Sequence, residues 1–493
     1  MPTSSTFLRD VANGAVAERF VAWLGRVRLG DGALLALIVA VMVFPLISIR
    51  AYHYEEGLTA ALAKDALTGD PWYVPELFGA RWVERPVMQS WIIAAISIPL
   101  GGVSQISARL PTVAALFSVA LLLSWLLRER VSRSATMVAA LCFLFSPAIL
   151  QKVVTAEADT LVTAFGFAAF VVWWKGYEAG HVGLLRWLAI GLLLAATALC
   201  KGPQPAAFFP LGVGAFILVK RDWRQLPGYA LAGIISLGIL GAWYVAATDA
   251  ADANQLLVYM RLADTATEDG GNGYFIERLH FAEILIAFLP GLLLMAPLLL
   301  AWIRRKESLD IGPRDRTLVL ALALYVGIAL LALALWPGAK TRYAMPALPA
   351  IAALAGLAFD RLTVRRSILS RAALVILSGL VVYQVVWGWI VAPLFPDRFA
   401  GSRIAARVIE EATRSKPYVI FAPLRLNDAP LAYLDRPVRY IPYPDLASLP
   451  APSFLLIDLP GAENFAARRN DVTLILHAII GERRLGLYEV VPR

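Results

Sequence analysis

A series of about eleven apolar runs constrains the fold of this chain more than any other feature. Runs of this kind are long enough to cross the roughly 30 Å of hydrocarbon in a bilayer. Because backbone polar groups find no water in that layer, the runs are expected to form helices. We therefore predict a polytopic α-helical membrane protein with about 11–13 transmembrane helices. The runs lie at 32–49, 109–127, 134–150, 159–174, 185–200, 205–219, 228–247, 281–303, 317–336, 343–359 and 369–393.

The composition agrees with a membrane protein and argues against a soluble one. Of the 493 residues, 59% are hydrophobic and only 16% are charged, whereas soluble domains carry about 25% charged residues. The net charge of +9 falls in short clusters between the apolar runs, a pattern that indicates membrane orientation and no nucleic-acid partner. Cys142 and Cys200 lie in or beside apolar runs without CxxC spacing, so we predict neither a disulfide framework nor a zinc site.

Basic clusters occupy alternate connections between the runs. Under the positive-inside rule, these connections and the N-terminal segment 1–31 lie in the cytoplasm. The other connections then lie on the outer face, including one outer loop at 50–108 and another at 248–280. Within the first loop, the apolar run 88–101 is short for a span and is predicted to be an interfacial or re-entrant helix.

The last hundred residues have a different character from the apolar part. We predict a transmembrane domain over 32–396 and a second domain over 397–493. In this tail, β-rich runs such as "YVIFA", "VRYI", "FLLIDL" and "LGLYEV" accompany the helical pattern "IAARVIEEATR". An odd number of spans places the tail on the same side as the outer loops. The tail is therefore predicted to be a small extracytoplasmic α/β domain.

Acidic side chains gather in two of the outer connections. Glu55 and Glu56 open a helix soon after the first span, where the helix dipole alone would favour carboxylates. Glu157 and Asp159 stand at the mouth of an almost wholly apolar run. Ionisable groups near hydrocarbon are costly and are functional candidates for that reason, although a helix cap by Asp159 is the simpler alternative.

Cations gather on the same predicted face. The simpler interpretation of Lys201 is that its side chain reaches a lipid headgroup and anchors the helix there. Two cations on the short turn at 340–343 oppose the topological bias, and a phosphate ligand would explain them. A further acid and base stand together before Pro86, where a solvated ion pair is the plain alternative. The residues concerned are Glu84 and Arg85, Lys201, and Lys340, Arg342 and Tyr343.

These acids and cations together suit group transfer from a phosphate-linked donor. A carboxylate is needed to accept the proton of the incoming hydroxyl, and Lys or Arg is needed to stabilise the departing phosphate. We therefore predict an enzyme. A membrane transporter is the alternative, because intramembrane charges also line transport pathways. A divalent ion near Glu157 and Asp159 stays open as well, although the spacing does not require one and we predict no metal ligands.

Seven short stretches between about 50 and 360 resemble, in order, the C-type (GT-C fold) integral-membrane glycosyltransferases. The resemblance is to the bacterial aminoarabinose transferases and the protein O-mannosyltransferases. The stretches are "YEEGL", "GDPWYVP", "VERP", "SARLPT", "AEADTL", "CKGP" and "KTRYAMPALPA". The resemblance implies a polyprenyl-phosphate-linked sugar as donor, inversion at the anomeric carbon, and a lipid, glycan or protein acceptor on the outer face. It also implies a multi-pass enzyme of the inner (plasma) membrane that modifies lipid A or another cell-envelope glycan, with a lipid-linked oligosaccharide ligase as the alternative.

The same resemblance implies roles for particular residues. The family's base corresponds to Glu55 or Glu56, and both stay open because Tyr54 replaces the family's leading Asp. Its second acidic position corresponds to Asp159, and Arg85 stands where the family has Lys. The implied phosphate-holding cations are Arg85, Lys201, Lys340 and Arg342, and the other residues expected to line the site are Glu84, Glu157 and Tyr343.

Overall fold

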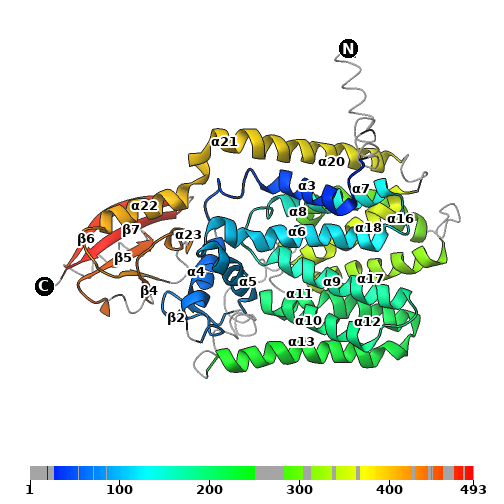
Figure 1. The fold of residues 1–493 in the computed structure, drawn as a ribbon, viewed down its shortest axis with the longest axis horizontal. Coiled ribbons are helices and arrows are strands. Elements are labelled where there is room, and N and C mark those ends of the chain that lie inside the picture. The colour runs from blue at the N-terminus through cyan, green and yellow to red at the C-terminus, as the bar shows by residue number, and fades with distance from the viewer. Residues whose placement is uncertain are drawn as a thin grey trace, which may run out of the picture.

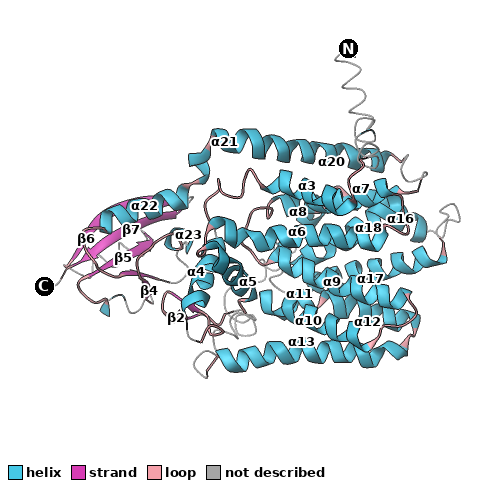
Figure 2. Ribbon diagram, in the orientation of Figure 1, coloured by secondary structure: helices cyan, strands magenta, loops and turns pink. Residues whose placement is uncertain are grey.

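The computed structural model is a bundle of helices with a small sheet domain at one end, as Figure 1 shows. Figure 2 shows that strands are concentrated in that end domain, whereas the bundle is helical. The structure describes residues 19, 27–53, 55–69, 71–84, 86–249, 282–303, 312–335, 340–361, 367–423, 428–441, 446, 448–458, 471–480 and 483–491. The predicted N-terminal segment 1–31 and outer loop 248–280 therefore lie largely outside the described residues.

The bundle is built from two successive series of helices. The first contains α3 (Asp31–Val43), α6 (Gln105–Leu127), α7 (Arg133–Leu144), α8 (Pro147–Leu150), α9 (Asp159–Glu178), α10 (Leu184–Lys201), α11 (Pro203–Ala206), α12 (Phe208–Lys220), η2 (Trp223–Gln225) and α13 (Leu226–Ala247). The second contains α16 (Gly291–Ile303), α17 (Pro313–Leu335), η4 (Thr341–Ala347), α18 (Leu348–Phe359), α20 (Ile368–Val386), η5 (Trp387–Val391) and α21 (Ala392–Leu394).

Six of the described helices are long and apolar enough to cross a membrane, which agrees with a multi-pass membrane protein. They are Gln105–Leu127, Leu184–Lys201, Trp223–Ala247, Pro313–Leu335, Thr341–Phe359 and Ile368–Leu394. Several predicted runs form shorter helices instead. The run 134–150 divides into α7 and α8, because the Ser146 side chain caps α8 by accepting from the Ile149 N–H at 3.4 Å. The run 205–219 likewise divides between α11 and α12.

Two neighbouring helices place charged residues at one end of the bundle. α9 begins at Asp159, and the antiparallel helix α10 ends at Lys201. Gly202 follows with a φ of 84°, a left-handed conformation that glycine adopts easily. The chain therefore turns directly after Lys201, and this lysine stays beside the start of α9.

Several short elements connect α3 to α6 and lie between the bundle and the sheet domain (Figure 1). They are α4 (Glu55–Thr68), β1 (Glu76–Leu77), β2 (Ala80–Arg81), α5 (Met88–Ser97) and η1 (Ile98–Leu100). The short run predicted at 88–101 corresponds to α5 and η1. A capping box between Ser104 and Ser107 then starts α6.

The C-terminal residues form the small α/β domain that the sequence predicts. Its elements are η6 (Pro396–Phe399), α22 (Gly401–Thr413), β3 (Ile420–Ala422), α23 (Asp428–Leu431), β4 (Val438–Tyr440), β5 (Ser453–Asp458), β6 (Val472–Ile480) and β7 (Arg483–Val490). The sheet order is β4-β3-β5-β7-β6. β3 pairs in parallel with β4 and β5, whereas β7 is antiparallel to β5 and β6. Ile409 of α22 packs with Ile420 and Phe454 in the core of this domain.

The sheet domain is docked on α4. The Lys64 ammonium donates to the Ala432 carbonyl oxygen at 2.7 Å. The Tyr433 hydroxyl accepts from the Tyr52 backbone N–H at 2.8 Å, and the rings of these tyrosines stack. The segment that carries Glu55 is therefore held between the bundle and the C-terminal domain.

Candidate active site

Two adjacent glutamates at the start of α4 lie in different surroundings. Glu55 is partly exposed, and its carboxylate accepts from Arg342 Nη2 at 3.0 Å. The Glu56 side chain is completely buried on the other side of the helix start. The sequence did not distinguish these two glutamates. In the structure, only the Glu55 carboxylate is partly exposed, whereas that of Glu56 is buried.

Glu56 is enclosed by hydrogen-bond donors. Arg109 Nε donates to Glu56 Oε1 at 3.0 Å, and Arg50 Nη2 donates to Oε2 at 2.9 Å. The Ala156 backbone N–H adds a bond to Oε1 at 2.9 Å. Burial alone would raise the pKa of Glu56, but the charges and hydrogen bonds of Arg109 and Arg50 outweigh it and hold the pKa below its ordinary value. Glu56 is thus an ionised anchor at neutral pH.

Arg109 connects this anchor to the chain that leads into α4. Besides binding Glu56, its guanidinium donates to the carbonyl oxygens of Ile47 and Arg50, both at 2.7 Å. Arg109 is fully buried in α6. Because these carbonyls lie at the end of the segment that follows α3, Arg109 fixes the position from which α4 begins.

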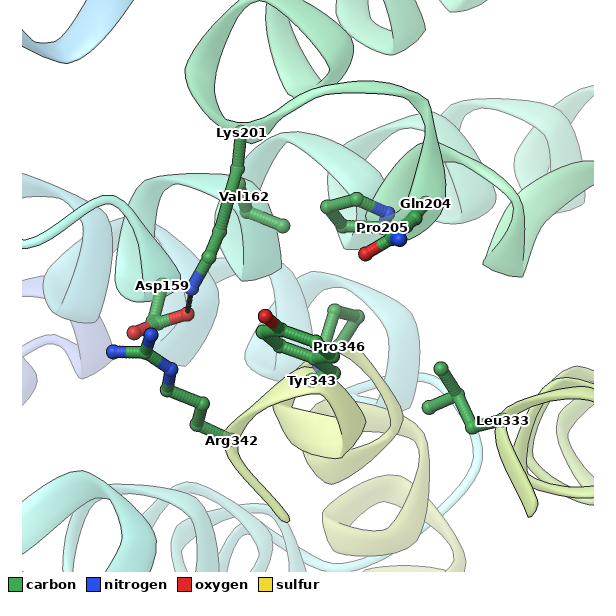
Figure 3. A pocket seen from close by; sticks show the side chains of 9 residues that line it. All are labelled: Asp159, Val162, Lys201, Gln204, Pro205, Leu333, Arg342, Tyr343 and Pro346. Atoms are coloured by element: carbon green, nitrogen blue, oxygen red, sulfur yellow. Dashed lines mark hydrogen bonds and ion pairs between the residues drawn. The ribbon is translucent and has the colours of Figure 1, made fainter. Parts of the chain in front are cut away.

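A second pair of charges lies at the start of α9. Lys201 Nζ donates to Asp159 Oδ1, and both side chains are almost fully buried. Figure 3 shows Lys201, Asp159 and Arg342 pointing toward one another from three different elements. The Tyr343 ring lies beside them, 5.2 Å from Lys201 Nζ and 5.9 Å from the Arg342 guanidinium carbon.

These residues line a cavity with one polar wall and one apolar wall. The space between them, including the part open to solvent, is about 390 Å³. Asp159, Lys201 and Arg342 form the polar wall, and the apolar side is closed by residues from α9, α11, α17 and η4. The apolar and aromatic lining residues are Val162, Pro205, Leu333, Tyr343 and Pro346 (Figure 3). Cations on one side and apolar side chains on the other are an arrangement that suits an anionic group attached to an apolar chain.

Lys152 extends the charged cluster and was missing from the sequence prediction. It follows α8, donates to Glu157, and lies 3.8 Å from Asp159 Oδ2. Burial raises the pKa of Glu157, and the nearby Lys152 charge opposes this shift. Lys152 could have been identified from the sequence, because it is a cation in a predicted outer connection. The cations of the turn at 340–343 were selected on that ground.

The other predicted site residues have less contact with the cluster. Lys340 is exposed at the start of η4, and Glu84 is partly buried after β2. Arg85 lies outside the described residues. Of the outer loop 248–280, only the first two residues are described, and Asp249 pairs with Arg81 at 2.6 Å. In the described part of the chain, no group of three or more His, Cys, Asp or Glu side chains is placed to hold a metal ion.

The fold has a close counterpart among solved structures. ArnT from Cupriavidus metallidurans, bound to undecaprenyl phosphate, superimposes with a TM-score of 0.69 at 16% identity, over 92% of this chain and 97% of that one. This chain has the GT-C fold of that structure. The fold that the order of sequence motifs implied is thereby confirmed.

Sequence comparisons agree with the GT-C assignment. Residues 84–244 match the family model described as dolichyl-phosphate-mannose-protein mannosyltransferase. The undecaprenyl phosphate-α-4-amino-4-deoxy-L-arabinose arabinosyl transferase of Pseudomonas aeruginosa is 27% identical over 314 residues, which cover 61% of this chain. A relative of the same name from Edwardsiella ictaluri is 26% identical over 219 residues, or 43% of this chain. The match to the Pseudomonas protein spans about half of that protein, 54% of its length.

Proposed function

We propose that this GT-C protein transfers a sugar from a polyprenyl-phosphate donor to an acceptor hydroxyl or similar nucleophile. The observation that carries the proposal is a chain of charges from four elements: Asp159 of α9, Lys201 of α10 and Arg342 of η4 line one cavity, and Glu55 of α4 pairs with Arg342. Burying this many charges is costly unless they are paired or bind a ligand. A phosphate-linked substrate uses both kinds of charge.

The proposed reaction is a single displacement. The acceptor oxygen attacks the anomeric carbon of the donor sugar while the bond between that carbon and the phosphate oxygen breaks. The acceptor proton passes to the Glu55 carboxylate, and the polyprenyl phosphate departs as an anion. Attack from the face opposite the phosphate inverts the anomeric carbon.

Glu55, and not Glu56, is the proposed base. Its carboxylate is partly exposed, whereas both oxygens of Glu56 already accept hydrogen bonds from buried donors. A general base must reach the proton that it removes. Arg342, which contacts Glu55 in the structure, would turn to the donor phosphate when substrate binds.

Lys201 and Arg342 are the proposed phosphate-stabilising cations. Both line the cavity, and charge develops on the departing phosphate as the bond to the sugar breaks. Asp159 is proposed to orient Lys201, because it receives the Lys201 hydrogen bond from the start of α9. Lys340 and Arg85 are kept as proposed contacts of the donor, and Glu84, Glu157 and Tyr343 as proposed lining residues.

The relatives suggest a particular donor. Their name specifies undecaprenyl phosphate-linked 4-amino-4-deoxy-L-arabinose, and we propose the same class of donor here, with a lipid or glycan as acceptor. We also propose that the chain lies in the inner membrane, with the cavity and the C-terminal domain on the extracytoplasmic side. The basic connections at the other end of the bundle support this orientation.

The decisive test is sugar transfer by the purified full-length protein. Labelled 4-amino-4-deoxy-L-arabinose on undecaprenyl phosphate would be incubated with envelope lipids, and labelled mannose on the same carrier would test the alternative donor. Glu55→Gln is expected to lower the rate roughly 10²–10⁴-fold, the usual contribution of a general base, while donor binding persists. Glu129→Gln, an exposed carboxylate at the other end of the bundle, is the matched control.

Two results would contradict the proposal. One is transfer by Glu55→Gln at the wild-type rate, which would remove this residue as the base. The other is that neither donor is consumed, while the protein in proteoliposomes carries substrate across the membrane. That result would support the transporter interpretation. Transfer of a preassembled glycan but of neither single sugar would support the oligosaccharide ligase.

A further inference from the structure

A second cavity lies at the end of the bundle opposite the candidate active site. Its volume, including the part open to solvent, is about 1190 Å³. It is lined by the last turn of α9, the start of α10, η2 and the start of α17. α9 connects the two sites, with Asp159 at one end and Glu178 at the other. Its twenty residues rise about 30 Å, which is the thickness of the hydrocarbon layer. α10, which is long and apolar enough to cross a membrane, also runs between the two sites, from Leu184 near the second cavity to Lys201 in the first. A bilayer crossed by α10 places the second cavity at the level of the opposite lipid headgroups.

The inner part of this cavity is held rigidly. Arg130, whose side chain is 5% exposed, donates to Glu178 and to Asp315 Oδ1, the latter at 2.8 Å. Its guanidinium carbon lies 5.7 Å from the Trp174 ring centroid. Gln225 accepts from Trp173 and donates to Asp222 Oδ2, both at 2.7 Å. The two carboxylates offset the charge of Arg130, and these contacts fix the walls around it.

The outer part carries two arginines that form no ion pair among the described residues, in a cavity that Glu178 and Asp222 also line. Arg224 and Arg314 line the cavity and are exposed. Across the described ranges, neither guanidinium has a carboxylate within ion-pair distance, whereas Arg130 has two. Two arginines at the mouth of a cavity present planar donors that suit a phosphate.

The surroundings favour a lipid as the source of that phosphate. Leu184 and Leu185, at the start of α10, are 64% and 81% exposed, and Trp223, next to Arg224, is 52% exposed. Tryptophan is enriched at membrane interfaces, and exposed leucines beside it suit acyl chains. Basic pockets between helices on the cytoplasmic side commonly hold acidic lipid headgroups.

We propose that this second cavity binds the phosphate headgroup of an anionic phospholipid. Arg224 and Arg314 hold the phosphate at the mouth. The rest of the headgroup lies against Trp187, Tyr177 and His181, which also line the cavity. The acyl chains lie against the exposed apolar residues at the start of α10. The site is separate from the donor cavity and does not depend on the proposed transferase activity.

The test compares lipid retention by the full-length protein in detergent, measured by native mass spectrometry with phosphatidylglycerol and phosphatidylethanolamine as the added lipids. The double variant Arg224→Gln/Arg314→Gln is expected to lose phosphatidylglycerol retention by roughly tenfold or more, because each cation near an anionic headgroup contributes measurably. The variant Lys220→Gln/Arg316→Gln removes the same charge from exposed residues that do not line the cavity. This control is expected to retain the lipid like the wild type.

A competition experiment separates the two sources of phosphate. Glycerol 1-phosphate at millimolar concentration is expected to leave phosphatidylglycerol bound, because it lacks acyl chains. Displacement of the lipid by glycerol 1-phosphate, with the same dependence on Arg224 and Arg314, would overturn the lipid proposal in favour of a soluble phosphate ligand. Equal retention of both lipids by wild type and both double variants would overturn the site itself. Each variant is expected to have the same thermal unfolding temperature as the wild type, which verifies that its fold is intact.

Discussion

Single residues in the first turn of α4 show how position relative to a neighbouring helix changes the chemistry of a carboxylate. Glu55 and Glu56 point to different surroundings because successive helix positions differ by about 100°. Glu56 meets Arg109 of α6 and is buried, whereas Glu55 is partly exposed and pairs with Arg342, which lines the cavity. Substitutions at these residues are therefore expected to separate stability from catalysis.

Arg109→Ala is expected to destabilise the protein by about 3–5 kcal/mol, because removing one partner leaves the buried Glu56 charge without compensation. Thermal or denaturant unfolding in detergent measures the change. The double variant Arg109→Met/Glu56→Met removes both charges and is expected to recover part of the loss. If the double variant loses more unfolding free energy than the two single substitutions lose when added together, the buried pair does not have this role.

The pH dependence of stability provides a separate prediction for Glu56. Its pKa is lower in the folded state than its ordinary value, so its contribution to stability is complete above the ordinary carboxyl pKa and is lost as pH falls through the lowered one. The wild type is expected to lose stability in acid more steeply than Glu56→Gln. Unfolding midpoints measured from about pH 6 down to pH 3 test this prediction, and equal slopes for both proteins would contradict it.

At the scale of elements, close helix packing positions the apolar wall of the candidate site. α12 and α17 approach at Gly212, where an added Cβ would lie 2.5 Å from the Tyr325 Cα. α17 also supplies Leu333 to the cavity. The contact of these helices therefore depends on the absence of a side chain at 212, a common device in membrane helix packing.

Gly212→Ala is expected to push α12 from α17 and to lower the unfolding temperature, because the clash is with backbone and cannot be relieved by a side-chain rotation. Overpacking of this kind costs roughly 1–3 kcal/mol. The control is Gly327→Ala on α17, where an added Cβ meets nothing within 4 Å. It is expected to be neutral or stabilising, since alanine favours helices. Equal effects of the two substitutions would exclude the packing explanation.

At the scale of the whole molecule, the C-terminal domain and the bundle enclose the segment that presents Glu55. The Tyr433 hydroxyl accepts from the Tyr52 backbone N–H, and Lys64 binds the Ala432 carbonyl. Burial raises the pKa of Tyr433 to about 12, so its hydroxyl stays neutral at physiological pH. The small domain therefore supports the start of α4 in addition to having its own core.

Tyr433→Phe is expected to loosen this docking, because the buried Tyr52 N–H would lose its acceptor at a cost of roughly 1–3 kcal/mol. Hydrogen exchange of the peptide that contains Tyr52 and Glu55 is expected to become faster, with a lower rate of sugar transfer. Tyr418→Phe, in the same domain but packed against Phe454, serves as the control. Unchanged exchange near Tyr52 in Tyr433→Phe would show that the domain does not support α4 in this way.

The sequence alone determined the helical membrane class, the α/β tail and the GT-C resemblance, because apolar runs, strand patterns and short motifs are local properties of the chain. It also selected Asp159, Lys201 and Arg342 as candidates, because charges at the ends of apolar runs are costly, and it selected Glu55 and Glu56 together without separating them. It did not reveal breaks within apolar runs, such as the one at Ser146, because a single capping side chain ends one helix and starts the next.

Only the tertiary structure decided which of these charges meet. Glu55 and Arg342 are 287 residues apart, and Asp159 and Lys201 are 42 apart, so their pairing depends on how α4, α9, α10 and η4 pack. The different surroundings of Glu55 and Glu56 have the same origin, because Arg109 belongs to another helix. Local patterns indicate where a charge is expensive, and the packing of distant elements determines which partner or ligand compensates for it.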